Sequence, residues 1–442
     1  MEENRKIRVA ITHGDTNSIG YELIFKTFAA PEMLDICTPI IYGSPKVATY
    51  HRKALNLQAN FSIISDATEA RDGRVNLLTC FDDEVKVDFG MPTKESNEAA
   101  LLALDRAISD YRNGLFDVLV TTPVDEGGLE ASGVKFPSQQ AYIESCLGDG
   151  VKALPMLINE PISMALATNN LPMRDVPDAI TAELLENRLK ILYRALKRDF
   201  RILNPRVAVL SLNPNVGEYG NFGKEEQNVI TPTINKLADD GVNVFGPYAS
   251  DELFRGDTYD AFDAILALYH DQGIAPFKAL EPEEGVIYLA GLNIVCTAPE
   301  NDGGFAIAGK GIADEMAFRH AIYLAIDIYR NRMGYDAPFE NPLPKLYHEK
   351  KDDSEKVRFA VPKKFDSAFP KKRDNREKGP RDNDANRRGP HQDADKAAEA
   401  KDGEAMTSEL KASEPKPFDA TRQDAKASDP ADATPAEGNA NE

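Results

Sequence analysis

Short apolar runs alternate with stretches in which apolar and polar positions recur at helical spacing, from residue 7 to about residue 330. The first run, Ile7–Thr12, is rich in β-branched residues and is followed by Gly14 and Asp15, then by helical spacing over Ile19–Phe28. This order predicts a strand, a turn and a helix. Further strands are expected at Pro39–Tyr42, Phe61–Ile64, Val75–Leu78, Phe116–Val120, Val207–Leu212, Ala264–Leu268, Val286–Leu289 and Ile294–Thr297.

Longer helices are predicted between these strands. The clearest is Ala182–Lys197, where leucines recur at three- and four-residue spacing at positions 185, 189, 192 and 196. Others are expected at Glu95–Arg112, Glu225–Leu237 and Ile312–Ile328. Strands that alternate with helices are typical of an α/β architecture. The sequence shows no internal repeat.

The last part of the chain has a different composition. Residues 351–442 contain 19 lysines and arginines, 21 aspartates and glutamates, and few aliphatic residues. Such a segment cannot bury enough apolar surface to offset the entropy lost on ordering, so it is predicted to be a disordered tail. The domain organisation expected is therefore a body over residues 1–350, with a second subdomain at roughly 130–275, and a tail over 351–442.

Most of the formal net charge of −20 falls on the body, because charges in the tail nearly cancel. An acidic body argues against nucleic-acid binding and favours a soluble cytoplasmic protein. The four cysteines are widely spaced and without a CxxC pair, which predicts reduced thiols. The charged N-terminus is unlike a signal peptide, and no apolar run approaches the ~20 residues of a membrane span.

Six segments carry the candidate chemistry. They read ITHGD with IGYE, TTPVDEGGLEASGVKFPSQQAYIE, ATNNLPMRDVPDAIT, LNPNVGEYGNFGKEE, ALYHDQGIAPFKAL, and GLNIVCTAPENDGGFAIAGKG. Each is a weak signal alone, because a Gly-Asp turn or a lone histidine usually has a structural role. In this order, over about residues 6–332, they resemble the 4-hydroxythreonine-4-phosphate dehydrogenase family of pyridoxal phosphate biosynthesis.

The resemblance implies an isocitrate/isopropylmalate-dehydrogenase-like fold, with two α/β domains, an active-site cleft between them, and a homodimer. It also implies NAD and a divalent cation as cofactors. Members of this family oxidise a secondary alcohol beside an amino acid carboxylate, and the keto acid then loses CO2 to give 3-amino-2-oxopropyl phosphate. The cation polarises the alcohol oxygen and stabilises the enolate that decarboxylation forms.

Three histidines hold the metal in the family, and only one is kept here. By resemblance the first falls on Gln139, the second on Asn215 and the third on His270. Amides are poor ligands for the zinc-like ions that imidazole favours. The resemblance therefore implies a metal site that has lost two of its three histidines.

The substrate positions of the family differ as well. The pair that follows TxPV is an Asn or His and a Lys in the family, and it is Asp125 and Glu126 here. The family Asn is replaced by Ile287 and the family Arg by Cys296, whereas Lys278 is kept. A carboxylate in place of the lysine repels a phosphate dianion.

Two further runs depart from the family pattern. The THxP histidine is replaced by Asn170, and the Asp-His-Gly-Thr run reads Glu300-Asn301-Asp302-Gly303. The changes remove histidine, lysine and arginine while the surrounding Gly, Pro and apolar positions persist. This indicates a divergent homologue that keeps the fold and has abandoned the chemistry. Two alternatives stay open: a dehydrogenase for an unphosphorylated or cationic substrate, or a non-catalytic dimeric scaffold whose tail recruits a partner.

Several residues allow two interpretations. His270 with Asp271 is either a catalytic acid/base pair or a strand-end histidine bonded to backbone. His13 is interpreted as an exposed turn histidine, with a replacement metal ligand as the alternative. Cys296 is interpreted as a small buried hydrophobe, with a nucleophile as the alternative.

Two segments are open in the same way. Gly217, Gly220 and Gly223 precede Lys224 and read either as a phosphate-binding loop or as a turn before an ordinary helix cap. The basic stretch Lys363–Arg388 is either a solvated linker or a contact for an acidic partner.

Overall fold

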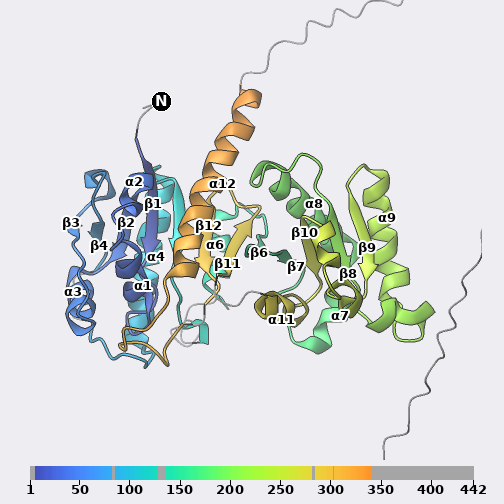
Figure 1. Ribbon diagram of the computed structural model, residues 1–442, viewed down its shortest axis with the longest axis horizontal. Coiled ribbons are helices and arrows are strands. Elements are labelled where there is room, and N and C mark those ends of the chain that lie inside the picture. The colour runs from blue at the N-terminus through green and yellow to red at the C-terminus, as the bar shows by residue number, and fades with distance from the viewer. Residues whose placement is uncertain are drawn as a thin grey trace, which may run out of the picture. The chain divides into compact units, whose positions relative to one another are not determined.

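Twelve strands pair into one mixed sheet in the described part of the computed structural model, with helices packed against it (Figure 1). The strand order is β3-β4-β2-β1-β5-β12-β11-β6-β7-β10-β8-β9. The structure describes residues 5–81, 85–127, 136, 138–280, 284–301 and 303–340. The strands are β1 (Ile7–Thr12), β2 (Cys37–Gly43), β3 (Ser62–Ile64), β4 (Asn76–Thr79), β5 (Val118–Thr121), β6 (Leu154–Ile158), β7 (Ser163–Leu166), β8 (Val207–Leu210), β9 (Val244–Tyr248), β10 (Ala264–Ala267), β11 (Val286–Ala290) and β12 (Val295–Pro299).

Helices connect most of these strands. Two short helical turns, η3 (Pro214–Gly220) and the π-helical η4 (Glu226–Ile230), follow β8. The α-helices are α1 (Gly20–Thr27), α2 (Met33–Ile36), α3 (Pro45–Ala54), α4 (Lys94–Arg112), α6 (Gln139–Leu147), α7 (Val176–Ala179), α8 (Ala182–Arg198), α9 (Thr231–Asp239), α10 (Ser250–Leu253), α11 (His270–Leu280) and α12 (Met316–Glu340).

The sheet contains two groups of parallel strands joined by antiparallel ones. β1 pairs in parallel with β2 and β5, and β5 pairs in parallel with β12. At the other end, β7 pairs in parallel with β10, and β8 with both β10 and β9. β11 runs antiparallel to both β12 and β6, so it links the two groups.

Both faces of the first group are buried, and successive residues of one strand enter different cores. Val9 and Ile11 of β1 pack in a cluster with α1, α8 and α12, whereas Ala10 packs with α4 and α6. This is the two-sided burial that makes strands of parallel sheets apolar at almost every position. It explains why the strand runs are visible in the sequence without alternation.

The predicted α/β class is confirmed, and most predicted elements lie within a few residues of those observed. The four leucines predicted for one face of α8 are all buried, at positions 185, 189, 192 and 196. The described residues all fall in one compact unit. Strands β6 to β10 lie within the predicted second subdomain, but the division into subdomains stays a prediction.

Two predicted helices differ from those observed. The helix expected at Ile312–Ile328 begins at Met316, whose N–H is capped by the Asp314 carboxylate at 2.8 Å, and ends at Glu340. Gly309 and Gly311 adopt positive φ in the turn that precedes it. The helix expected at Glu225–Leu237 is divided into the π turn η4 and α9.

Other elements were not predicted because their sequences lack a clear period. β6 and β9 contain proline, and α3 and α11 carry few apolar residues at helical spacing. The predicted tail over 351–442 and its basic stretch Lys363–Arg388 lie outside the described residues. Within the described residues, no helix combines the length and apolar character that a membrane crossing requires.

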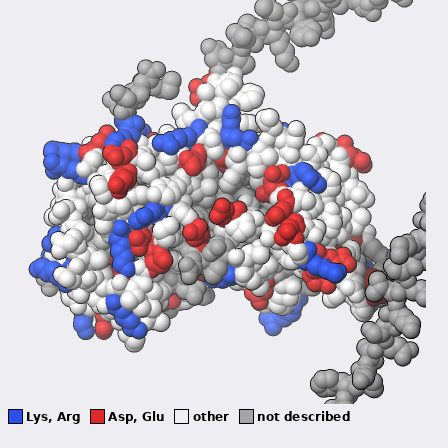
Figure 2. Space-filling view, viewed as in Figure 1, with Lys and Arg blue, Asp and Glu red and all other residues white. Residues whose placement is uncertain are grey.

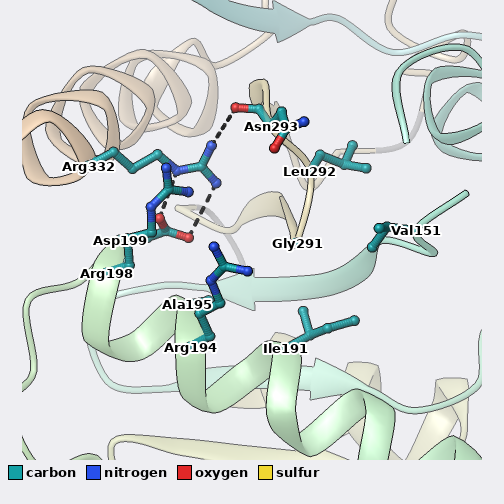
Figure 3. A pocket seen from close by; sticks show the side chains of 10 residues that line it. All are labelled: Val151, Ile191, Arg194, Ala195, Arg198, Asp199, Gly291, Leu292, Asn293 and Arg332. Carbon is teal, nitrogen blue, oxygen red and sulfur yellow. Dashed lines mark hydrogen bonds and ion pairs between the residues drawn. The ribbon is translucent and has the colours of Figure 1, made fainter. Parts of the chain in front are cut away.

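A buried ionic network fastens α12 to the sheet. Arg332 Nε donates to Asp199 Oδ1 at 2.7 Å, and Arg332 Nη2 donates to Tyr288 Oη at 2.7 Å. The Tyr288 hydroxyl in turn donates to Asp199 Oδ2 at 2.6 Å. Arg332 Nη1 donates to the Asn293 carbonyl at 2.7 Å (Figure 3). All three charged or phenolic groups are buried, so each depends on the others for its polar partners.

Candidate functional site

Three neighbouring parallel strands end at one edge of the sheet and lead directly into candidate residues. The chain leaving β7 reaches Asn170, the chain leaving β10 reaches His270, and the chain leaving β8 reaches Asn215. Carboxyl ends of parallel strands meet at the same edge, which is where α/β sheets usually bind ligands. The topology therefore groups Asn170 with Asn215 and His270, whereas Gln139 comes from α6 and not from this group of strands.

The Gln and Gly of the Tyr-His-Asp-Gln-Gly run hold this edge together. Gln272 is buried; its Oε1 accepts from Leu268 N at 2.7 Å and its Nε2 donates to the Ser211 carbonyl at 2.6 Å. These bonds join the ends of β10 and β8. A Cβ on Gly273 would lie 2.5 Å from a side-chain carbon of Leu166, so a larger residue requires the Leu166 side chain to move. Two of the five residues of the run, Gln272 and Gly273, are thus explained by their structural role alone.

His270 is the first residue of α11 rather than the end of a strand, which corrects the strand-end interpretation. Its Nδ1 lies 2.8 Å from Asp271 Oδ1, so its partner is a carboxylate and not backbone. The side chain is 49% exposed. His270 and Asp271 are therefore paired through their side chains at the surface of this sheet edge, and their role as a catalytic acid/base pair stays a prediction.

Asn215 lies in a left-handed turn. Five successive residues, Asn215 to Tyr219, have φ between 39° and 74°. Each non-glycine residue there costs roughly 1–2 kcal/mol relative to a right-handed turn, and β-branched Val216 is especially unfavourable. Strain of this kind persists only where the surrounding structure imposes it.

The carboxylate of Glu226 imposes this turn. Glu226 is buried, and its Oε1 accepts from Leu212 N at 2.9 Å and from Asn213 N at 2.8 Å. These two N–H groups precede the glycines of the loop, so the interpretation as a phosphate-binding loop stays a prediction. Glu225, at the N-cap position of η4, makes no side-chain capping bond, which argues against the ordinary-cap interpretation.

A pocket of about 260 Å³ brings three of the altered family positions together. Glu126, Gln139 and Ile287 all line it, and we call it the Glu126 pocket. Gln139 Nε2 donates to the Thr122 carbonyl at 3.5 Å, a weak bond. The full lining is Thr121, Thr122, Pro123, Val124, Glu126, Gln139, Gln140, Ile287, Ala298, Pro299, Asn301 and Gly303.

The charge of this pocket is acidic. Glu126 is the one charged side chain in its described lining, and desolvation raises the pKa of its carboxyl although part of the residue is exposed. Behind the pocket, Asp15 is fully buried and accepts from Asn17 N at 2.7 Å and from Ser96 Oγ at 2.8 Å. Burial raises the pKa of Asp15, and the nearby charge of Asp125 raises it further.

The retained lysine is already paired. Lys278 Nζ lies 3.1 Å from Glu300 Oε2, and Glu300 belongs to the run that departs from the family pattern. The positive charge that the family pattern would direct at a phosphate is thus balanced by a carboxylate of this chain.

Cys296 has the structural role expected of it. It lies in β12, is 2% exposed, and burial raises the pKa of its thiol to about 12. A thiol that stays protonated at neutral pH is a poor nucleophile. All four cysteines are free thiols, as predicted.

The interpretation of His13 as an exposed turn residue is wrong. Its side chain is fully buried, stacked on Tyr21 with ring centroids 5.2 Å apart and packed edge-on against Phe81. Desolvation lowers its pKa to about 3, with His51 adding to the effect. Neither ring nitrogen has a well-aligned hydrogen-bond partner. This burial could not be read from the local pattern, because Phe81, which packs against His13, is far away along the chain.

The residues present do not fit the metal that the family uses. Among the described residues, no group of three or more His, Cys, Asp or Glu side chains is placed to hold an ion. His270 is joined at its sheet edge by two amides, Asn170 and Asn215, and Gln139 lines a different pocket. Amide oxygens without a carboxylate or a second imidazole make a weak site for a divalent transition metal.

An arginine-lined pocket of about 170 Å³ lies at the other end of β11 from Ile287 (Figure 3). Arg332 is bonded to Asp199, and Arg198 Nε donates to Asp336 at 3.0 Å. These guanidinium groups act within the network that fastens α12. The face seen in Figure 2 shows Lys and Arg interspersed with Asp and Glu and no broad basic area.

Comparison with known proteins gives a consistent result. A family model described as "Pyridoxal phosphate biosynthetic protein PdxA" matches residues 35–325. The 4-hydroxythreonine-4-phosphate dehydrogenase of Bacteroides thetaiotaomicron is 52% identical over 358 residues, covering 81% of this chain and 98% of that enzyme. The enzyme of the same name from a Sulfurihydrogenibium species is 32% identical over 326 residues, covering 74% and 99%.

Solved structures agree on the fold. The crystal structure of a 4-hydroxythreonine-4-phosphate dehydrogenase from Burkholderia phymatum matches with a TM-score of 0.61 and 28% identity, covering 74% of this chain and 99% of that one. The enzyme of that name from Klebsiella pneumoniae gives a TM-score of 0.64 at 24% identity, again over 74% and 99%, which supports the fold alone.

Proposed function

The chain belongs to the PdxA family of pyridoxal phosphate biosynthetic proteins, and on that basis we propose that it is a divergent relative of the 4-hydroxythreonine-4-phosphate dehydrogenases that no longer oxidises their phosphorylated substrate efficiently. An identity of 52% leaves nearly half of the aligned positions different. The activity therefore depends on which residues occupy the site, and not on the overall sequence identity. Fold and core are kept, as the sheet and the buried Gln272 illustrate.

The observation that carries this proposal is the charge of the Glu126 pocket. A phosphate dianion needs cations or N–H donors, and the described lining offers one charged side chain, which is a carboxylate. Lys278, the retained cation, is paired with Glu300. The altered positions Asp125 and Cys296 add a second acid nearby and a buried thiol where the family has a guanidinium.

The cofactors follow from family membership as proposals. NAD would be the hydride acceptor of any dehydrogenase activity that remains. The divalent cation is not supported by the residues present, because His270 stands with Asn215 and Asn170, and Gln139 lies in another pocket. A homodimer and a cytoplasmic location are proposed on the same family basis.

A second function is favoured by one observation. The raised pKa of Glu126 marks a carboxyl held in a partly desolvated pocket. With Asp125 nearby, such a group can bind an amine or act as a general base near neutral pH. This supports a dehydrogenase for an unphosphorylated, cationic substrate. The alternative of a non-catalytic scaffold places the function in residues 351–442, as a segment that recruits a partner.

Binding measurements test the proposal. Calorimetric titration of the full chain with Zn²⁺, Mn²⁺ and Mg²⁺, each with and without NAD, should show no saturable metal binding at micromolar concentrations. A variant carrying Asn170→His and Asn215→His is the matched comparison and should gain affinity. Tight metal binding by the unmodified chain would contradict the proposal. A screen for NADH production over amino- and hydroxy-acids then separates the cationic-substrate enzyme from the scaffold.

A further inference from the structure

A second pocket lies on the other side of the start of α6 from the Glu126 pocket. It has a volume of about 180 Å³ and shares Gln140 with that pocket. We call it the Arg188 pocket. Its lining is Ser138, Gln140, Ala141, Glu144, Lys152, Ala153, Pro155, Leu166, Asn169, Asn170, Arg188 and Leu289.

Arg188 brings a partly buried cation to this pocket. Its Nη1 donates to the Ala153 carbonyl at 2.7 Å and its Nε to the Ala167 carbonyl at 3.2 Å, so the guanidinium bridges the start of β6 and the end of β7. Burial lowers the pKa of Arg188, but a guanidinium remains protonated in proteins. Among the described residues it forms no ion pair. The carboxylate of Glu144 acts on Arg188 through its charge, but its hydrogen bond goes to the backbone, where it accepts from Ala153 N at 2.8 Å.

Two other features add positive potential. Lys152 is exposed and has no ion pair within the part of the chain that the structure describes. α6 begins beside the pocket, where the Ser138 hydroxyl accepts from Ala141 N at 3.1 Å. The N–H groups of Gln139 and Gln140, in the first turn of this nine-residue helix, have no intrahelical carbonyl to bind.

We propose that the Arg188 pocket binds a small oxyanion group, the carboxylate or phosphate of a ligand. A partly buried guanidinium that forms no direct ion pair among the described residues can still bind an anion, although the carboxylate of Glu144 lies near enough to act on it. An anion at this point would be held by Arg188, Lys152 and the first turn of α6 together. The inference goes beyond the proposed function, because it concerns binding and holds whether or not the chain turns a substrate over.

The competing interpretation is structural. Arg188 then serves only to join the Ala153 and Ala167 carbonyls, and Lys152 is an ordinary solvated side chain. The two interpretations differ at Lys152, which contacts neither strand. Its replacement lowers anion affinity under the proposal and changes nothing under the structural interpretation.

The test is calorimetric titration of the full chain with inorganic phosphate and, separately, with acetate, at constant ionic strength set by NaCl. We expect saturable binding in the millimolar range by at least one probe. Tighter binding of phosphate identifies a phosphoryl ligand, and tighter binding of acetate identifies a carboxylate. If neither probe gives saturable heat, the proposal is overturned.

Three variants make the result specific. Lys152→Gln should weaken binding several-fold, and Arg188→Met should weaken it about ten-fold or more, as expected for loss of a charged hydrogen bond. Arg194→Gln is the matched control. It removes one positive charge from α8, the helix that carries Arg188, but at the arginine-lined pocket, so it should bind the probes as the unmodified chain does. If Arg188→Met fails to fold, Lys152→Gln decides. Binding by Lys152→Gln equal to that of the control overturns the proposal.

Discussion

Lys278 Nζ lies 3.1 Å from Glu300 Oε2, so the lysine kept from the family pattern is neutralised by a carboxylate from the run that has changed most. The pair is partly exposed, with side-chain exposures of 41% and 13%. Retention of a residue type therefore says little about retention of its role. The environment of the residue has to be compared as well.

Replacing Glu300 by Gln should release this lysine. We expect the affinity for 4-phosphohydroxy-threonine to rise by a few-fold, since partly exposed ion pairs are worth about 1 kcal/mol or less. Calorimetry of the two proteins measures the change. Glu315→Gln, which breaks the pair with Arg319 on α12, removes the same charge elsewhere and should have no effect. Equal affinities for both variants would refute a specific role of Glu300.

Two buried neutral histidines should make stability depend on pH. The pKa of His13 is lowered to about 3 and that of His51 to about 4, both by desolvation first. Unfolded histidine titrates near 6.5, so below that pH the unfolded chain binds protons that the folded chain does not. Stability is complete above pH 6.5 and falls as the pH is lowered, by about 1.4 kcal/mol per pH unit for each histidine.

Urea unfolding at pH 7 and pH 5 measures this loss, about 2 kcal/mol for each histidine. His13→Phe, which fits the aromatic surroundings of Tyr21 and Phe81, should reduce the difference by about half. The raised pKa of buried Asp15 acts in the opposite direction, and because the variant keeps Asp15, comparing the two proteins removes its contribution. If the loss of stability between pH 7 and pH 5 is the same in the unmodified chain and in His13→Phe, the imidazole of His13 is not its cause.

Gln272→Ala should destabilise the fold by about 2–4 kcal/mol, because it leaves the buried N–H of Leu268 and the carbonyl of Ser211 without partners. The midpoint of urea unfolding gives the value. Asp271→Asn, at the exposed neighbouring position, should change stability by less than about 0.5 kcal/mol. If Gln272→Ala lowers the unfolding free energy by no more than Asp271→Asn does, the structural role of Gln272 at the sheet edge is contradicted.

Arg332→Met should cost about 3–5 kcal/mol, because it leaves the buried Asp199 carboxylate without its cation. The expected signature is a lower unfolding midpoint at neutral pH. Circular dichroism during denaturation measures it. Full stability of the variant at neutral pH would show that the network does not fasten α12.

The fold could be predicted where local pattern and packing agree. The α8 leucines and the apolar strands are read from the sequence because each depends on its own periodicity and on burial by any apolar neighbour. β9 and α3 could not be predicted in this way, since Gly-Pro and polar residues occupy them for reasons set by neighbouring elements.

The candidate site could be predicted only in part, for the same reason. The family resemblance identified Glu126, Gln139 and Ile287, and the structure places all three in one pocket. The sequence could not show that the lining of this pocket includes Gln139 but neither His270 nor Asn215. That follows from the pairing of β7, β10 and β8, which is a long-range property of the sheet.

Turnover of 4-phosphohydroxy-threonine is the most direct test of the central claim. NADH formation by the purified full chain would be followed with NAD and Mg²⁺, Mn²⁺ or Zn²⁺, beside the Bacteroides thetaiotaomicron relative as the positive control. The account predicts no NADH formation above background for this chain, because the Glu126 pocket repels the phosphate and the metal ligands are replaced. A turnover rate of about 1 s⁻¹ or more, typical of enzymes, would contradict it.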